Sequence, residues 1–378
     1  MDICVLNPYF FPYHGGTEKV LLEVYKRLSK RHNISVITSA PEGQKERSVD
    51  YVEGIKVVRL PAKFIYFRAL PLPFLVMNDL NSAIAEERAE LYHINNRYQY
   101  AMGNIRAIRA INAKLALTIH NSLPSGIDAF TDFGGLAYDL LLGRRIMHES
   151  DIITGVSGYA IRSTVPKEDR HKSHVVYNGV DYKLFRPGKK DPGLGIADTN
   201  IPIILNNGRL VRQKGQAALI KAFAMLSSSH DAKLVIIGRG PLEGKLTALA
   251  RRLGVNGRFK ITMNISESAL PSYYRSSSLF VLPSLYEPAG LALMEAMACA
   301  TPSIASKTGG IPEIMGRCGA YINPNDINMI YSKMLFALEN MRSAERLARC
   351  ARKRVIARNN WDAIAKRYES LFSAAIKR

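Results

Sequence analysis

In both halves of the chain, short apolar runs alternate with longer amphipathic segments. Of all the sequence features, this alternation restricts the possible folds most strongly. In the first half the apolar runs are residues 3–6, 34–38, 56–60, 91–94, 113–119, 152–156 and 174–177. In the second half they are residues 203–206, 233–237, 259–261, 279–282, 302–305 and 320–322. Such runs, separated by helices of about ten to fifteen residues, are typical of parallel sheets covered by helices. The sequence therefore predicts an α/β protein with two Rossmann-like domains.

The stretch between the halves is rich in glycine, proline and charge and has no periodicity, as is typical of an interdomain linker. We therefore predict an N-terminal domain over residues 1–186, a linker over 187–201 and a C-terminal domain over 202–358. Residues 359–378 are predicted to form a terminal helix whose apolar side carries Trp361, Tyr368 and Phe372.

The 378 residues carry a net charge of +20, which favours an anionic partner. Nucleic acid is not expected, because the chain has no recognisable nucleic-acid-binding motif. An anionic membrane surface and a phosphorylated substrate remain as candidate anionic partners. Two segments mix cations with apolar residues and are candidates for peripheral membrane contact, residues 63–68 and residues 105–114. For residues 105–114 an ordinary packing face with a solvated basic side is an equal alternative.

The four cysteines, Cys4, Cys299, Cys318 and Cys350, have neither paired spacing nor neighbouring histidines, so the sequence indicates no disulfide framework and no zinc site. No apolar run reaches the roughly eighteen residues of a membrane span, and the first residues do not resemble a signal peptide. These features predict a cytoplasmic protein in a reducing compartment.

The segment from Glu287 to Glu295 follows an apolar strand and turns into a helix near Gly290. Unpaired amides and the positive dipole end of a helix can hold phosphate oxygens, so the backbone of Ala289, Gly290 and Leu291 is a candidate diphosphate site. Glu287 and Glu295 can accept hydrogen bonds from hydroxyls on either side of the phosphates. A nucleotide sugar has this layout. The alternative is that acidic residues simply stabilise a helix N-terminus.

Other candidate residues also follow predicted strands, where ligands bind in open parallel sheets. Arg209 and Lys214 bracket a loop that opens a helix, and two cations there can meet two phosphates. Gly238 begins a further tight turn. The alternative is a basic loop on a basic protein.

In the first half, Gly15 and Gly16 follow the first strand, and Thr17 is predicted to cap the next helix. A plain strand-to-helix turn is the alternative. His120 follows a later strand and faces the predicted ligand edge, although a lone histidine is more often a structural hydrogen bonder.

The chain has no Asp-x-Asp pair, no Walker loop and no Gly-x-Gly-x-x-Gly after the first strand. The first absence argues for phosphates held without a metal, and the others argue against ATP hydrolysis and against a dinucleotide dehydrogenase.

Together these motifs resemble the retaining glycosyltransferases of the GT-B fold, family 4. The resemblance spans nearly the whole chain and is strongest over residues 207–313. It is carried by Gly15–Gly16, His120, Asn178–Asp181 with Phe185, Gly208–Arg209, Lys214–Gly215, Gly238 to Pro241, Glu287 to Glu295, and Gly309–Gly310 with Glu313.

The resemblance implies two Rossmann-like domains with parallel sheets that face a central cleft, and a C-terminal helix that crosses back to the N-terminal domain. The N-terminal domain would receive the acceptor and the C-terminal domain the donor. Arg209 and Lys214 would bind the donor diphosphate, and Gly16 would approach it from the other domain. Glu287 and His120 would contact the transferred sugar, whereas Glu295 would hold the ribose.

The implied activity is transfer of a hexosyl or N-acetylhexosaminyl group from a nucleoside diphosphate sugar to a glycan, lipid-linked or small-molecule hydroxyl, without a cofactor or a metal. The departing phosphate would help to deprotonate the acceptor. A sugar-nucleotide 2-epimerase on the same fold and a non-catalytic module that binds anionic surfaces are the alternatives. Ala289, Ala300 and Asn121 depart from the family pattern, so the identity of the sugar cannot be carried over.

Overall fold

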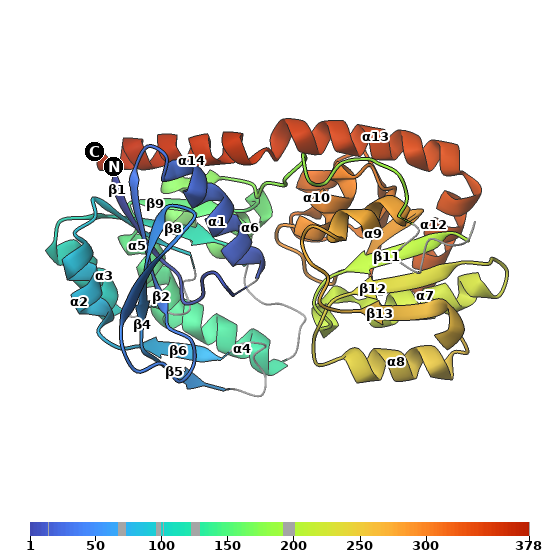
Figure 1. Cartoon of the computed structure of the whole chain (residues 1–378), viewed down its shortest axis with the longest axis horizontal. Coiled ribbons are helices and arrows are strands. Elements are labelled where there is room, and N and C mark those ends of the chain that lie inside the picture. Colours follow the sequence, from blue (N-terminus) through green and yellow to red (C-terminus); the bar gives the residue numbers. More distant parts are fainter. Residues whose placement is uncertain are drawn as a thin grey trace. The chain divides into compact units, whose positions relative to one another are not determined.

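A computed structural model of the chain contains two compact α/β units (Figure 1). It describes residues 1–13, 15–66, 73–95, 100, 102–121, 129–191 and 201–377. The first unit contains residues 1–178 together with the terminal helix α14 (Trp361–Ile376), and the second contains residues 179–360. Each unit has the Rossmann-like architecture that the alternation predicts.

The first unit is built on an eight-stranded sheet with the order β10-β9-β8-β7-β1-β2-β4-β3. Its strands are β1 (Asp2–Leu6), β2 (Asn33–Ser39), β3 (Ser48–Val52), β4 (Ile55–Leu60), β7 (Leu91–Ile94), β8 (Lys114–Ile119), β9 (Ile152–Gly155) and β10 (Ser173–Val175). The sheet is parallel as predicted, except that the edge strand β3 pairs antiparallel with β4. Strand β3 escaped prediction because it lies at the sheet edge and buries no residue. A separate hairpin joins β5 (Ala62–Ile65) and β6 (Phe74–Met77).

The first unit also contains helices (Figure 1). They are α1 (Gly16–Leu28), α2 (Leu80–Glu87), α3 (Met102–Ala110), α4 (Ala129–Tyr138) continued by the π-helical turn η2 (Asp139–Gly143), α5 (Arg144–Glu149), α6 (Gly158–Thr164) and the 3-10 turn η3 (Lys167–Lys172). Helix α14 packs on α1 and on the sheet. The rings of Tyr368 and Phe372 lie 5.7 and 5.1 Å from that of the buried His93, and Asp362 accepts from Arg27 at 2.6 Å.

The second unit has a six-stranded, fully parallel sheet with the order β13-β12-β11-β14-β15-β16. Its strands are β11 (Ile203–Asn207), β12 (Lys233–Ile237), β13 (Phe259–Thr262), β14 (Leu279–Leu282), β15 (Ser303–Ser306) and β16 (Ala320–Ile322). Its helices are η5 (Arg212–Lys214), α7 (Gln216–Ser227), α8 (Glu243–Arg252), η6 (Asn256–Arg258), α9 (Leu270–Ser276), α10 (Leu291–Ala298), α11 (Ile311–Met315), α12 (Ile327–Glu339) and α13 (Met341–Arg358). Each strand lies within two residues of its predicted position, because strands covered on both faces are continuous apolar runs.

The division between the units falls after Asn178, earlier than the linker predicted over residues 187–201. Val180 and Phe185 are buried in the core of the second unit, and Arg275 donates to the carbonyl oxygen of Arg186 at 2.7 Å. These contacts join residues 179–186, which were predicted to belong to the N-terminal domain, to the second unit. Residues 192–200 of the predicted linker lie outside the described residues. The chain returns to the first unit after Asn360.

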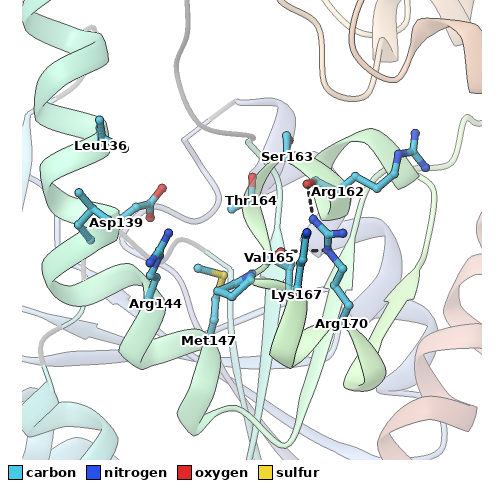
Figure 2. Close-up of a pocket in the computed structure, with 12 residues that line it drawn as sticks. Leu136, Asp139, Arg144, Met147, Arg162, Ser163, Thr164, Val165, Lys167 and Arg170 are labelled. Carbon is cyan, nitrogen blue, oxygen red and sulfur yellow. Dashed lines mark hydrogen bonds between the residues drawn. The ribbon is translucent and has the colours of Figure 1, made fainter.

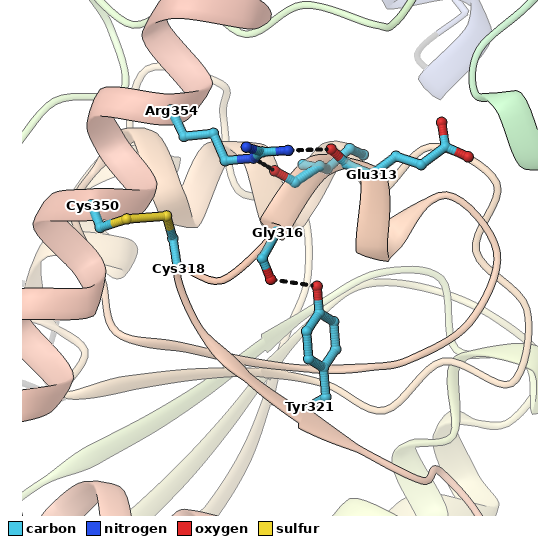
Figure 3. Close-up of a disulfide and its surroundings, with 7 residues drawn as sticks. Glu313, Gly316, Cys318, Tyr321, Cys350 and Arg354 are labelled. Carbon is cyan, nitrogen blue, oxygen red and sulfur yellow. Dashed lines mark hydrogen bonds between the residues drawn. A yellow bond between two sulfur atoms is a disulfide. The ribbon is translucent and has the colours of Figure 1, made fainter.

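The structure corrects the prediction that no disulfide is present. Cys318, in the loop after α11, is bonded to Cys350 on α13, whereas Cys4 and Cys299 are free and buried (Figure 3). Beside the disulfide, Arg354 donates to the carbonyl oxygens of Ile314 and Glu313 at 2.7 and 2.8 Å. These hydrogen bonds connect α11 to α13. Because two of the four cysteines are bonded to each other, the cysteines no longer support the prediction of a reducing compartment. This pair could not be predicted from spacing, because the two cysteines are 32 residues apart and meet only in the folded unit.

The structure shows which parts of the two candidate membrane segments are packed in the first unit. On α3, Ile105 and Ile108 belong to the core, and Arg109 pairs with Asp151 at 2.8 Å, so the packing-face alternative is correct for this helix. Residues 63–65 of the other segment belong to β5 (Ala62–Ile65), while Phe67 and Arg68 lie outside the described residues. No helix in the described ranges has the length and apolarity needed to cross a bilayer.

Candidate functional site

The order of strands in the second sheet reverses between β11 and β14, which are neighbours although two strands intervene in the sequence. Ligands of open α/β sheets bind beyond the carboxyl ends of the strands at such a point. Lys214 lies in the loop after β11, and Glu287 lies in the loop after β14. The fold therefore brings two predicted site residues, 73 positions apart, to the place where a ligand is expected.

Glu287 is the centre of this site. The residue is 7% exposed, and its carboxylate accepts from Lys214 Nζ at 2.5 Å, from Ser284 Oγ at 3.2 Å and from the backbone amide of Gly290 at 3.2 Å. A buried carboxylate keeps its charge only when a cation and hydrogen-bond donors compensate the loss of hydration. These three donors fix the orientation of the carboxylate before any ligand arrives.

The glycine motif after β15 explains how Glu287 is held from its other side. Gly309 has φ +57°, and a Cβ atom there would lie 2.1 Å from the carbonyl oxygen of Glu287. The amide of Gly310 donates to that same oxygen at 3.0 Å. Only glycine permits this close approach in this conformation, so the Gly309–Gly310 turn clamps the loop that carries Glu287.

Helix α10 begins at Leu291 after Gly290, whose φ of +63° ends the incoming loop. The amide of Gly290 donates to Glu287 Oε1, which corrects the expectation that this amide is available to a phosphate. The first-turn amide of Leu291 remains, since no earlier helical carbonyl exists to accept from it. Ala289 is buried beside this turn.

Glu295 is also buried, one turn into α10, where Tyr274 donates to its Oε2 at 2.9 Å. Asn207, the last residue of β11, donates in turn to the Tyr274 hydroxyl at 2.9 Å. Burial, followed by the negative charge of Glu295, raises the pKa of Tyr274 well above its usual value. Tyr274 on α9 and Asn207 on β11 were not predicted as site residues, because only the folded unit brings them next to Glu295. Ser284 was not predicted either, although it lies only three residues before Glu287.

Arg209 and Gly238 occupy the same edge of the second sheet but differ in character. The side chain of Arg209 is exposed and makes no hydrogen bond or ion pair with the residues that the structure describes. A Cβ atom at Gly238 would lie 2.0 Å from the carbonyl oxygen of Gly208, so Gly238 allows two strand-end loops to pack together. That packing is sufficient to explain this glycine without a ligand.

In the first unit the order of strands reverses between β1 and β7. Gly15 and Gly16 follow β1, and α1 begins at Gly16 with Gly15 as its N-cap. No side chain caps this helix, so the predicted capping role of Thr17 is wrong. The absence of a side chain at Gly15 leaves room for the Glu18 carboxylate. His14 lies outside the described residues.

His120 follows β8 at this same edge, and its Nε2 lies 3.1 Å from Oδ1 of the buried Asn95, which follows β7. Asn95 donates through Nδ2 to the carbonyl oxygen of His93 at 3.2 Å, so its Oδ1 must accept from His120 Nε2–H. Burial lowers the pKa of His120 to about 4. The ring is therefore neutral near pH 7, with Nδ1 as an acceptor that suits a sugar hydroxyl.

We expect Asn95→Asp to raise the pKa of His120, so that its ring titrates near neutral pH, unlike in the natural protein. A carboxylate beside Nε2 stabilises the imidazolium and raises the pKa of His120, so the ring becomes protonated between about pH 8 and pH 5. In the natural protein the ring stays neutral down to a pH near its pKa of about 4. Histidine-ring NMR, with His120→Gln for assignment, measures the difference.

The Asn95→Ala variant is the control, because it removes the hydrogen bond without adding charge. The nearest titratable neighbour, His93, is buried against Tyr25, and burial lowers its pKa to about 3, so it does not titrate in this range. If His120 titrates near its ordinary pKa in the natural protein, or if Asn95→Asp leaves it unchanged, the assignment of the proton to Nε2 is wrong.

Two family models match the chain and together span most of it. "Glycosyltransferase Family 4" matches residues 14–184, and "Glycosyl transferases group 1" matches residues 194–354. Among curated proteins, an uncharacterized glycosyltransferase of Methanocaldococcus jannaschii is 32% identical over 56% of this chain and 55% of its own length. A GDP-mannose-dependent monoacylated alpha-(1-6)-phosphatidylinositol monomannoside mannosyltransferase of Corynebacterium glutamicum is 25% identical over 98% of this chain and 97% of its own.

Solved structures resemble the fold over nearly the full chain. A sucrose-phosphate synthase from Thermosynechococcus elongatus has a TM-score of 0.79 at 23% identity, with 98% of this chain and 99% of the other covered. The Anabaena protein HepE, in complex with UDP and glucose, has a TM-score of 0.79 at 21% identity and 99% coverage of both chains. The two matched family models establish that the chain belongs to glycosyltransferase family 4, and the likeness to these solved structures shows that it has the GT-B fold.

Proposed function

We propose that this hexosyl-type glycosyltransferase moves a sugar from a nucleoside diphosphate sugar to an acceptor hydroxyl, with retention of configuration and without a metal. The observation that carries the proposal is the preorganised Lys214–Glu287 pair at the switch point of the second sheet. A diphosphate needs cations and amides, whereas a sugar needs acceptors for its hydroxyls, and this site holds both within one loop cluster.

In this proposal Lys214, the exposed Arg209 and the first-turn amide of Leu291 bind the donor diphosphate, whose negative charge increases as the sugar departs. Preorganised cations stabilise such charge without reorganisation during the reaction. Glu287 accepts hydrogen bonds from hydroxyls of the transferred sugar, and Glu295, positioned by Tyr274, accepts them from the ribose. His120 accepts from a sugar hydroxyl through Nδ1, and Gly16 approaches the donor phosphates.

The proposed acceptor belongs to lipid-linked or cell-envelope glycan synthesis. The Corynebacterium glutamicum relative is named for a phosphatidylinositol mannoside, while a Bacillus anthracis relative that is 25% identical is named N-acetyl-alpha-D-glucosaminyl L-malate synthase. Together with the net charge of +20, the first of these names favours an acceptor at a membrane surface, where the protein would be peripheral.

A thermal-shift panel of UDP, GDP, ADP and dTDP sugars tests the donor site. We expect one nucleotide family to raise the melting temperature, since a ligand at a hundred times its Kd stabilises the folded state by about 2.7 kcal/mol. Transfer assays with that donor, with and without EDTA, test the metal, and the anomeric configuration of the product by NMR tests retention. Consumption of donor without any acceptor would instead identify a 2-epimerase, and the absence of any shift would contradict the donor site.

A further inference from the structure

The segment formed by α4 and η2 in the first unit carries a group of exposed large apolar side chains. Phe133, Leu136, Leu140 and Leu141 are 72%, 48%, 52% and 71% exposed. The first three are spaced by three and four residues, so they follow one side of a helix. Burying this side would remove apolar area from water, and a group of such residues on one surface marks an interaction site.

A cavity of about 240 Å³ adjoins this apolar group, and Leu136 and Leu140 belong to both. It lies between the α4–η2–α5 segment and the α6–η3 segment (Figure 2). The buried side chains of Met147 and Val165 also line it. Its charged lining consists of four cations and one carboxylate, namely Arg144, Arg162, Lys167, Arg170 and Asp139. The cavity therefore favours an anion.

The cations have different roles. Arg170 donates to the carbonyl oxygens of Val165 and Arg162 at 3.2 and 2.8 Å, so it holds one wall together. Arg144 and Lys167 are exposed and make no hydrogen bond or ion pair with any described residue. In Figure 2 they belong to opposite walls of the cavity. Two cations without a protein partner at one small cavity can bind a phosphate from both sides.

Two further polar residues of the lining, Asp139 and Thr164, do not argue against a bound anion. The Asp139 carboxylate is 5% exposed and lies against Gly143, where a Cβ atom would approach it to 2.2 Å, so it is tucked against its own helix. The hydroxyl of the buried Thr164, another lining residue, has no hydrogen-bond partner within the described part of the chain.

We propose that this surface docks on an anionic phospholipid bilayer, with a headgroup phosphate between Arg144 and Lys167 and the four apolar side chains among the acyl chains. Exposed apolar side chains next to cations are typical of interfacial helices, because one part enters the acyl boundary while the other meets anionic headgroups. The cavity is smaller than the roughly 300–1,000 Å³ of sites for whole small-molecule ligands, which suits a headgroup that remains attached to its membrane. The net charge of +20 adds long-range attraction to such a surface.

Vesicle sedimentation without nucleotide sugar tests the docking surface. We expect the natural protein to pellet with vesicles of phosphatidylcholine and phosphatidylglycerol, and not with phosphatidylcholine alone. Arg144→Gln with Lys167→Gln should lower the partition coefficient about thirtyfold, the contribution of two cations near an anionic surface. Leu140→Gln with Leu141→Gln should lower it about tenfold or more and make the remaining binding strongly salt-dependent.

The control is Lys333→Gln with Phe336→Gln on α12 of the second unit, which removes one exposed cation and one apolar side chain that is 61% exposed. It should bind vesicles as the natural protein does, within the change expected for one distant charge. The proposal is overturned if the control loses as much binding as the η2, α5 and η3 variants, because binding would then not depend on this surface. It is also overturned if inorganic phosphate raises the melting temperature through Arg144 and Lys167 while vesicles do not bind, or if Leu140→Gln with Leu141→Gln changes only the oligomeric state.

The docking surface goes beyond the proposed transfer reaction, and the two fail separately. Sedimentation needs no donor, and transfer to a soluble acceptor needs no membrane. If the protein does not bind vesicles but still transfers sugar to a soluble acceptor, the docking surface is contradicted and the proposed transfer reaction is not.

Discussion

Replacing Lys214 with alanine is expected to lower kcat/KM for transfer on the order of a hundredfold. The variant removes a preorganised cation from the position where the charge of the leaving diphosphate increases, a loss that typically costs ~3 kcal/mol. It also leaves the carboxylate of the buried Glu287 with the Ser284 hydroxyl and the Gly290 amide as its partners among the described residues. A steady-state transfer assay with the donor identified by thermal shift measures the loss.

The control for Lys214→Ala is Arg212→Ala on the same 3-10 turn. Arg212 is exposed and has no partner within the described ranges, so its removal changes the net charge equally without disturbing Glu287. The melting temperature of each free variant separates a folding defect from a catalytic one. Activity within a few-fold of the natural protein for Lys214→Ala would remove this residue from the donor site.

The Glu287→Gln variant is expected to lose still more activity, on the order of a thousandfold, because two sugar hydroxyls bonded to a charged group contribute about 1.5–3 kcal/mol each. The amide keeps the shape of the side chain and still accepts from the amide of Gly290, so the loop geometry should survive. In thermal shift, we expect the nucleoside diphosphate alone to stabilise this variant as much as it stabilises the natural protein. The additional stabilisation by the sugar should disappear.

Two comparisons make the Glu287 result specific. Glu243→Gln changes an acid in the first turn of α8, beyond the end of β12, and should leave transfer unaffected. The double variant Lys214→Ala with Glu287→Gln should lose clearly less than the product of the single losses, since residues in one ion pair are usually coupled by about 0.5–3 kcal/mol. Strict additivity would mean that the pair at 2.5 Å does not act as a unit in the reaction.

Some of the fold could be predicted because its physical cause is local. Strands such as β12 and β14 are covered on both faces, so their sequences are continuous apolar runs. Gly290 and Gly309 mark turns whose backbone conformation other residues adopt poorly. Strand β3 has no such pattern and was missed. Val180 and Phe185 lie in the range assigned to the N-terminal domain but are buried in the core of the second unit, because the sequence does not indicate which domain a short connecting segment packs against.

The same limit applies to apolar residues whose exposure depends on the rest of the fold. Ile105 on α3 and Leu140 on η2 both lie in helical segments with apolar spacing. The structure buries the first and leaves the second 52% exposed, which moves the expected membrane contact from one segment to the other. Periodicity indicates that a helix has an apolar side, but it does not indicate whether another element covers that side.

The sequence by itself determined the two α/β units, the positions of nearly all their strands, and the loops that carry the candidate residues, because hydrophobic periodicity and turn chemistry act over a few neighbouring positions. Only the tertiary structure decided which of those loops meet. Lys214 and Glu287 form a pair because β11 lies beside β14, and Asn95 orients His120 because β7 lies beside β8. The order of strands in a sheet follows from how all the helices and strands pack together, so no local segment of the sequence encodes it.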